Sequence, residues 1–147
     1  MNMKKTSEII PLDLIEIDDE GYHLMINIKI GRKKARLLLD TGASKTVFDE
    51  NRLKAILGDR SEFEDSEHLS TGLGTNKMES QTSNIKTIKI GSAKLKNIQV
   101  VVLDLSHVNV SYQLIGDKGI DGVFGSDLLS YFDAVIYYKN PRLKIYF

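Results

Sequence analysis

Hydrophobic and polar residues alternate with a period of two along much of the chain, which is the pattern of β-strands. The clearest run is residues 22–30, where one face is expected to consist of Tyr22, Leu24, Ile26, Ile28 and Ile30. Polar residues fill most of the opposite face, and Met25 is the apolar residue that does not fit it. Similar patterns predict strands at residues 32–40, 84–91, 95–105, 133–138 and 142–147.

Two short segments have features of helices. Residues 48–57 are predicted to form a helix capped by Asp49, with an inward face made of Leu53, Ile56 and Leu57. Residues 126–132 are predicted to form another helix, capped by Ser126. The acidic, polar stretch 58–70 is predicted to be a loop, because no apolar period runs through it.

The remaining residues are predicted to be strands and turns, so the fold class is all-β with one or two short helices. Many short strands favour a barrel or a sandwich. The sequence "KNPR", residues 139–142, is predicted to be a hairpin turn because Pro141 cannot donate a ladder hydrogen bond. The length of 147 residues predicts a single domain, residues 1–147.

Composition excludes several classes of function. Lys+Arg and Asp+Glu both number 20, so no excess charge attracts nucleic acid or an anionic membrane. The chain has no cysteine, which removes thiolate nucleophiles and zinc–thiolate sites, and its three histidines show no metal-binding spacing. No metal and no cofactor are therefore expected. The N-terminus lacks the apolar region of a signal peptide, which predicts a cytoplasmic protein.

An aspartate ends one of the predicted buried strands. Residues 36–39 are aliphatic or have aliphatic stems, and they lead directly into Asp40, Thr41 and Gly42. Burying a carboxylate costs free energy unless it is paired or hydrogen-bonded. Asp40 is therefore either a turn residue that caps its own backbone or the functional group of the protein.

Four segments carry a resemblance to a known family. They are "LLLDTGAS" (37–44), "STGLGTNKMES" (70–80), "GIDGVFGSDLL" (119–129) and "FDAVIYYKNPRLKIYF" (132–147). Their order and spacing resemble the retropepsin-like aspartic proteases, including the short bacterial relatives of retroviral proteases. The resemblance covers about Leu14 to Phe147, and it implies a closed acid-protease barrel that forms a two-fold homodimer.

The resemblance implies an aspartic endopeptidase with Asp40 as its catalytic residue. Peptide hydrolysis without a metal needs a base to activate water and an acid to protonate the carbonyl group, and two adjacent carboxylates supply both. Because the chain has one Asp-Thr-Gly triplet, the resemblance implies a homodimer in which each subunit contributes one Asp40. The expected partner is a peptide or protein substrate in extended conformation, and neither nucleic acid nor membrane.

Active-site support is implied for residues on both sides of the catalytic aspartate. Thr41 would form a hydrogen bond across the two-fold axis, the Gly42 carbonyl group would pair with substrate backbone, and Ala43 would complete the loop. A second segment would pack behind this loop and provide clearance for it: Val123, Phe124 and Gly125.

A substrate-binding flap is implied at Gly72, Leu73 and Gly74, whose backbone amides would close over the peptide. A plain structural hairpin is the alternative for this stretch. A nucleotide-binding loop is disfavoured, because the G-K-[ST] ending is missing.

The sequence departs from the retroviral pattern at two positions. Ser44 stands where aspartate is usual and Ser126 stands where arginine is usual, so the ion pair that supports the retroviral dimer is absent. We therefore expect a weaker dimer. The alternative function is a non-catalytic module of the same fold that binds an extended peptide or mediates dimerisation.

Overall fold

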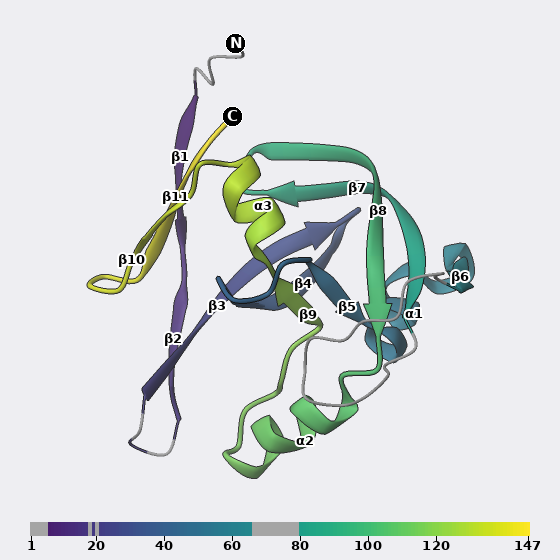
Figure 1. Ribbon diagram of the computed structural model, residues 1–147, viewed down its shortest axis with the longest axis horizontal. Coiled ribbons are helices and arrows are strands. Elements are labelled where there is room, and N and C mark those ends of the chain that lie inside the picture. The colour runs from purple at the N-terminus through teal and green to yellow at the C-terminus, as the bar shows by residue number, and fades with distance from the viewer. Residues whose placement is uncertain (1–5, 18, 20, 66–79) are drawn as a thin grey trace.

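The computed structural model in Figure 1 describes residues 6–17, 19, 21–65 and 80–147. Its strands are β1 (Ser7–Pro11), β2 (Asp13–Ile17), β3 (Gly21–Ile30), β4 (Lys33–Leu39), β5 (Val47–Asp49), β6 (Phe63–Asp65), β7 (Gln81–Ile90), β8 (Ala93–Leu103), β9 (Gly122–Phe124), β10 (Val135–Tyr137) and β11 (Arg142–Tyr146). Its helices are α1 (Glu50–Leu57), α2 (Ser106–Leu114) and α3 (Ser126–Tyr131), with a 3₁₀ turn η1 at Gly58–Arg60. The predicted all-β class is confirmed.

Six of these strands close into a barrel. The order β3-β4-β9-β5-β8-β7 returns to its start through a pairing of β7 with β3, at Ile88↔Ile30 and Lys89↔Lys29. β2 extends the sheet beside β3, and β6 extends it beside β7. β1, β11 and β10 form a separate three-stranded sheet, which lies beside the barrel in Figure 1.

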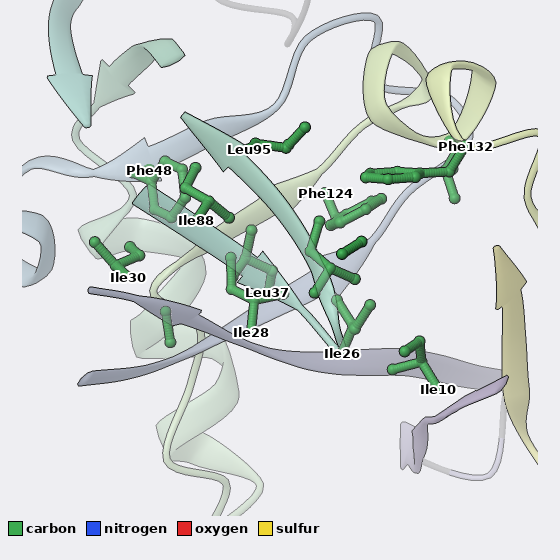
Figure 2. Packing of buried hydrophobic residues seen from close by; sticks show 14 of the residues in the cluster. Ile10, Ile26, Ile28, Ile30, Leu37, Phe48, Ile88, Leu95, Phe124 and Phe132 are labelled. Atoms are coloured by element: carbon green, nitrogen blue, oxygen red, sulfur yellow. The ribbon is translucent and has the colours of Figure 1, made fainter. Parts of the chain in front are cut away.

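Alternating side chains of the barrel strands fill its interior. Figure 2 shows Ile26, Ile28, Leu37, Phe48 and Phe124 among the residues packed there. Each of these side chains is at most 3% exposed. This packing anchors the ends of β4 and β9, which hold the site described below.

The inward face predicted for β3 is correct except at its first residue. Leu24, Ile26, Ile28 and Ile30 are buried, but Tyr22 is 56% exposed. Tyr22 pairs with Glu16 of β2 near the start of β3, before the pairing of β3 with β4 begins at Met25, so this end of the strand projects beyond the barrel core. Met25 is fully buried on the other face, where it belongs to a second apolar cluster.

The helix predicted at residues 48–57 is confirmed as α1. The Asp49 side chain accepts a hydrogen bond from the Arg52 backbone N–H at 2.9 Å, which caps the helix. Leu53 is fully buried, while Ile56 and Leu57 pack partly buried against the core.

The predicted cap of α3 is wrong. The cap position is Gly125, and Ser126 is already the first helical residue. The backbone N–H of Ser126 donates to the Ala43 carbonyl oxygen at 2.7 Å, so a loop far away in sequence satisfies this helix end.

The sequence patterns missed several elements. α2 was not predicted, nor were β1 and β2, and β6 with η1 lies in the stretch predicted to be a loop. α2 contains two valines, two serines and one asparagine, which are weak helix formers. A tertiary contact holds it: the Asn109 side chain donates to the Ile120 carbonyl oxygen at 3.0 Å and accepts from the Ile120 N–H at 2.8 Å.

In the part of the chain that the structure describes, no helix has the length and apolar character that crossing a membrane requires.

Candidate functional site

The barrel places Asp40 directly after the last residue of β4. Leu39 pairs with Phe124 in the parallel ladder between β4 and β9. The next backbone N–H, that of Asp40, donates to the Phe124 carbonyl oxygen at 3.0 Å. Two buried central strands therefore fix the backbone of Asp40, while its side chain is only partly buried.

The carboxylate of Asp40 is oriented by its own loop. The Gly42 backbone N–H donates to Asp40 Oδ1 at 2.9 Å, and the Ala43 N–H donates to the Asp40 carbonyl oxygen at 3.2 Å. In the ranges that the structure describes, Asp40 Oδ2 accepts no hydrogen bond and no cationic side chain pairs with Asp40. One oxygen is thus held by a turn, and the other is available to a ligand.

The residues that follow Asp40 lie at the surface. Thr41, Gly42 and Ser44 are exposed, and Ala43 is partly exposed. A Cβ atom on Gly42 would lie 3.2 Å from Asp40 Oδ1, so the absence of a side chain keeps space beside the carboxylate. The loop therefore presents both a carboxylate and exposed backbone on one surface.

The segment Val123–Gly125 lies directly behind this loop. Phe124 is fully buried in the barrel. A Cβ atom on Gly125 would come within 2.7 Å of the Lys45 carbonyl carbon and within 2.8 Å of the Ala43 carbonyl oxygen. Real Cβ atoms do not approach backbone this closely, so only glycine permits the contact between the start of α3 and the Asp40 loop.

Two residues that the sequence patterns missed tie this loop to α3. The Thr46 hydroxyl donates to Asp127 Oδ1 at 2.7 Å and accepts from the Gly125 backbone N–H at 3.0 Å. The Thr46 backbone N–H donates to Asp127 Oδ2 at 3.0 Å. No local pattern signals this network, because its partners are about eighty positions apart in the sequence.

Removing the Thr46 hydroxyl is expected to destabilise the loop. Thr46→Val leaves the buried Gly125 N–H without its acceptor and Asp127 without one donor, at a cost of about 2 kcal/mol in the free energy of unfolding. Thr46→Ser keeps the hydroxyl and is the matched control. Urea titration of both variants checks this expectation, and equal stabilities of the two would contradict it.

Asp121 has a structural position in the barrel. Its Oδ2 accepts from the Arg36 backbone N–H at 2.8 Å, and its own N–H donates to the Arg36 carbonyl oxygen at 2.7 Å. Its carbonyl oxygen accepts from the Asp49 N–H at 2.8 Å. The residue therefore joins β4 and β5 to the start of β9, and it does not meet the Asp40 carboxylate in any of these contacts.

An apolar row crosses the outer face of the sheet beside Asp40. The strand registers place its members side by side in the order Met25, Leu38, Val123, Val47 and Val101. Met25 is fully buried, whereas the other four are partly exposed. We call Leu38, Val123, Val47 and Val101 the apolar shelf.

Tyr112 of α2 belongs to the second apolar cluster, the one that contains Met25. Its hydroxyl lies 2.7 Å from His23 Nδ1. Burial raises the pKa of Tyr112 to about 12, and the negative charges of Asp117 and Asp40 act in the same direction against the opposing charge of Arg36. Because Leu38 and Val123 of the apolar shelf pack against the cluster that contains Tyr112, α2 flanks the same face as the shelf.

The predicted flap residues Gly72, Leu73 and Gly74 lie outside the described residues. The described strands on either side are β6 and β7, which pair through Phe63↔Ser83 and Asp65↔Gln81. The flap therefore stays a prediction.

The sequence of the chain matches a family of known proteins. A family model described as aspartyl protease matches residues 26–128, which is more than half of the chain. No curated protein matches the chain in sequence.

Solved structures with a similar fold include proteases of this type. A retropepsin-like aspartic protease from Rickettsia conorii is 22% identical, with a TM-score of 0.56 over 99% of this chain and 97% of that one. The EIAV protease complexed with the inhibitor HBY-793 is 18% identical, with a TM-score of 0.56 over 80% and 93%. The retroviral protease-like domain of Ddi1 from Leishmania major is 13% identical, with a TM-score of 0.53 over 80% and 82%. At these identities the likeness establishes the fold.

Proposed function

Because the chain belongs to the aspartyl protease family, we propose that it is an aspartic endopeptidase whose catalytic group is Asp40. One observation carries the proposal. The fold brings a carboxylate to the end of a buried central strand, holds one of its oxygens through the Gly42 N–H, and pairs it with no cation among the described residues. A buried carboxylate that served only the fold would be paired or fully hydrogen-bonded, whereas Asp40 is partly exposed and keeps one oxygen open to a ligand.

The proposed reaction uses two such carboxylates, one ionised and one protonated. The ionised carboxylate takes a proton from water, and the resulting hydroxyl attacks the peptide carbonyl carbon. The protonated carboxyl gives its proton to the carbonyl oxygen, which forms a neutral tetrahedral intermediate. This intermediate collapses as the carboxyl that took the water proton gives it to the nitrogen, the other carboxylate takes a proton from a hydroxyl group of the intermediate, and the C–N bond breaks. Two carboxyl groups in contact do not both ionise, because the two negative charges would repel each other. The pair therefore holds one proton.

The second carboxylate comes from a second copy of the chain in this proposal. One Asp-Thr-Gly triplet occurs in the sequence, and Thr41 and Gly42 beside Asp40 are exposed and accessible to a partner. A two-fold axis through this surface would bring the two Asp40 side chains together.

The substrate is proposed to bind as an extended peptide beside Asp40. The apolar shelf lies next to the Asp40 carboxylate. Leu38 of β4 is two residues before Asp40, and Val123 is paired with Leu38. Four partly exposed aliphatic side chains would take an apolar side chain of the substrate, while main-chain hydrogen bonds hold the peptide. We therefore expect cleavage next to apolar residues.

Hydrolysis of casein at a series of enzyme concentrations tests the proposal. New peptide termini are read by mass spectrometry, and specific activity is measured on dilution. Because the site needs two chains, specific activity is expected to fall about in proportion to concentration below the dissociation constant of the dimer. Ser44 and Ser126 replace the aspartate and arginine that form an ion pair in the retroviral pattern. We therefore expect the dissociation constant of this dimer to be higher than that of a dimer with the ion pair.

Two outcomes would contradict different parts of this proposal. If no peptide bond is cleaved at any concentration between pH 4 and pH 7, the chain is not this enzyme. If cleavage occurs with constant specific activity down to concentrations at which sedimentation shows only monomers, the two-chain site is wrong.

A further inference from the structure

A cavity of about 580 Å³ lies along one side of β7, away from Asp40 and its loop. Six consecutive residues of β7, Thr82 to Thr87, line one wall. Successive side chains of a strand point to opposite faces, so a strand presents consecutive residues to one cavity through its edge. The opposite wall comes from the C-terminal end of α1 and the residues after it, including Ile56, Leu57 and Asp59.

The sheet pairings leave this edge of β7 open. On the side away from β8, β7 pairs with β6 through Gln81–Ser83 and with β3 through Ile88–Lys89. Between them, the Thr87 carbonyl oxygen accepts from the Gly31 N–H at 3.0 Å. Within the described ranges, no strand pairs with residues 84–86 on this side. An open edge presents backbone N–H and C=O groups that another extended chain can satisfy.

The burial pattern of β7 changes at the open segment. The buried residues of β7 are Ser83 and Ile85 in its first half but Ile88 and Ile90 in its second half, so the alternation shifts by one position. On the neighbouring strand, Asn97 has a positive φ of 53° and is absent from the regular register. The strand therefore turns away from a straight path between its contacts with β6 and β3.

One lining residue is a buried serine whose hydroxyl has no partner among the described residues. Ser83 is 3% exposed, and in the part of the chain that the structure describes its hydroxyl oxygen forms no hydrogen bond. Burying an unsatisfied hydroxyl is unfavourable. Ile30, Ile56 and Ile85 also line the cavity. Most of the other lining residues are polar or charged, among them Glu62, Glu64 and Lys86, so the cavity joins an apolar patch to polar groups that an extended chain can contact.

We propose that this β7-edge cavity binds an extended segment of the polypeptide substrate, outside the residues that are held at Asp40. The inference rests on the proposed protease function. A peptide main chain supplies N–H and C=O groups at the spacing of the open edge, and the segment 84–86 is about 10 Å long, enough for about three residues. An aliphatic side chain of the segment would pack against the partly exposed Ile56, and a polar group would bond to Ser83 once its hydroxyl, which is buried in the free protein, turns toward the cavity.

The distance between the two sites favours one polypeptide reaching both. Thr82 at the cavity pairs with Val101 in β8, and from there the in-register row runs through Val47 and Val123 to Leu38 beside Asp40. This path crosses four strand spacings, which is about 19 Å. An extended chain covers this distance with about six residues, so a long substrate reaches both sites and a hexapeptide centred on Asp40 does not.

The experiment compares a long and a short substrate for the same cleaved bond. Casein is the long substrate, and a blocked hexapeptide copied from its main cleavage site is the short one. Lys86→Trp places an indole at the mouth of the cavity, and Lys94→Trp makes the same change at an exposed lysine of the β7–β8 hairpin that does not line it. Ser83→Ala removes the unsatisfied hydroxyl without adding bulk.

We expect Lys86→Trp to lower kcat/KM for casein about tenfold through KM, because main-chain bonds and one buried side chain are lost. Ser83→Ala is expected to lower it roughly threefold without lowering the unfolding midpoint of the free protein. Lys94→Trp is expected to change neither kcat/KM for casein nor the unfolding midpoint. The hexapeptide is expected to be cleaved equally by all the variants.

A direct binding measurement separates this inference from the proposed function. Fluorescently labelled casein is titrated with Asp40→Asn protein and with Asp40→Asn/Lys86→Trp protein, and anisotropy reports binding without hydrolysis. Weaker binding of the double variant supports the cavity. Equal binding, together with equal casein kcat/KM for wild type and Lys86→Trp, overturns it while the protease function stands. If the wild type cleaves neither substrate, the proposed function is what fails.

Discussion

Asp40→Asn is expected to lower kcat for peptide hydrolysis by about a thousandfold or more, because the amide can neither take a proton from water nor give one to the carbonyl oxygen. In a two-chain site the substitution removes both carboxyl groups at once. The measurement is the rate of appearance of new termini from casein, with the purified variant at the same concentration as wild type.

The fold is expected to survive this substitution. The asparagine Oδ1 atom can still accept the Gly42 N–H, which is the one hydrogen bond that the Asp40 side chain makes in the described part of the chain. Asp13→Asn, the same change at an exposed carboxylate of β2, is the control and is expected to keep full activity. Undiminished cleavage by Asp40→Asn protein with native circular dichroism would eliminate Asp40 as the catalytic group.

Gly125→Ala is expected to be the most damaging of the small substitutions near the site. Its Cβ atom would lie 2.7 Å from the Lys45 carbonyl carbon and 2.8 Å from the carbonyl oxygens of Ala43 and Lys45. These are backbone atoms, which cannot rotate away as a side chain can. The Asp40 loop must therefore move from α3, which strains the Ser126–Ala43 and Gly125–Thr46 hydrogen bonds. We expect a loss of about 3 kcal/mol in the free energy of unfolding.

Gly21→Ala is the matched control for this prediction. A Cβ atom on Gly21 would have no heavy atom within 4 Å, and its φ lies outside the left-handed region. The control is therefore expected to change the free energy of unfolding by less than about 0.5 kcal/mol. Urea titration compares the two variants, and a Gly125→Ala protein as stable as the control would show that the loop and α3 are not tightly coupled.

Both predictions depend on the same design. Asp40 is placed by backbone bonds to β9, and the loop after it is placed by α3 through Thr46, Gly125 and Ser126. The site is thus rigid behind the carboxylate and exposed in front of it. The proposed function needs this arrangement, because it would fix a catalytic group while leaving room for a substrate and a second subunit.

The sequence by itself determined the features that depend on neighbouring residues. The period of two predicted most of the barrel strands, because strand side chains alternate between the core and the outside. Asp49 followed by a helical pattern predicted α1, because a side-chain cap acts within three residues. The motif around Asp40 was visible because its strand, its carboxylate and its glycine are contiguous.

Only the tertiary structure decided the features that depend on distant residues. α2 forms although its residues are weak helix formers, because Asn109 and Tyr112 gain buried contacts with other segments. Thr46 reaches Asp127 across 81 positions, and the open edge of β7 exists because β6 and β3 end where they do. Met25 is buried because the outer face of the barrel carries a second apolar cluster. Such contacts leave no period in the sequence, since each depends on which segments the closed barrel brings together.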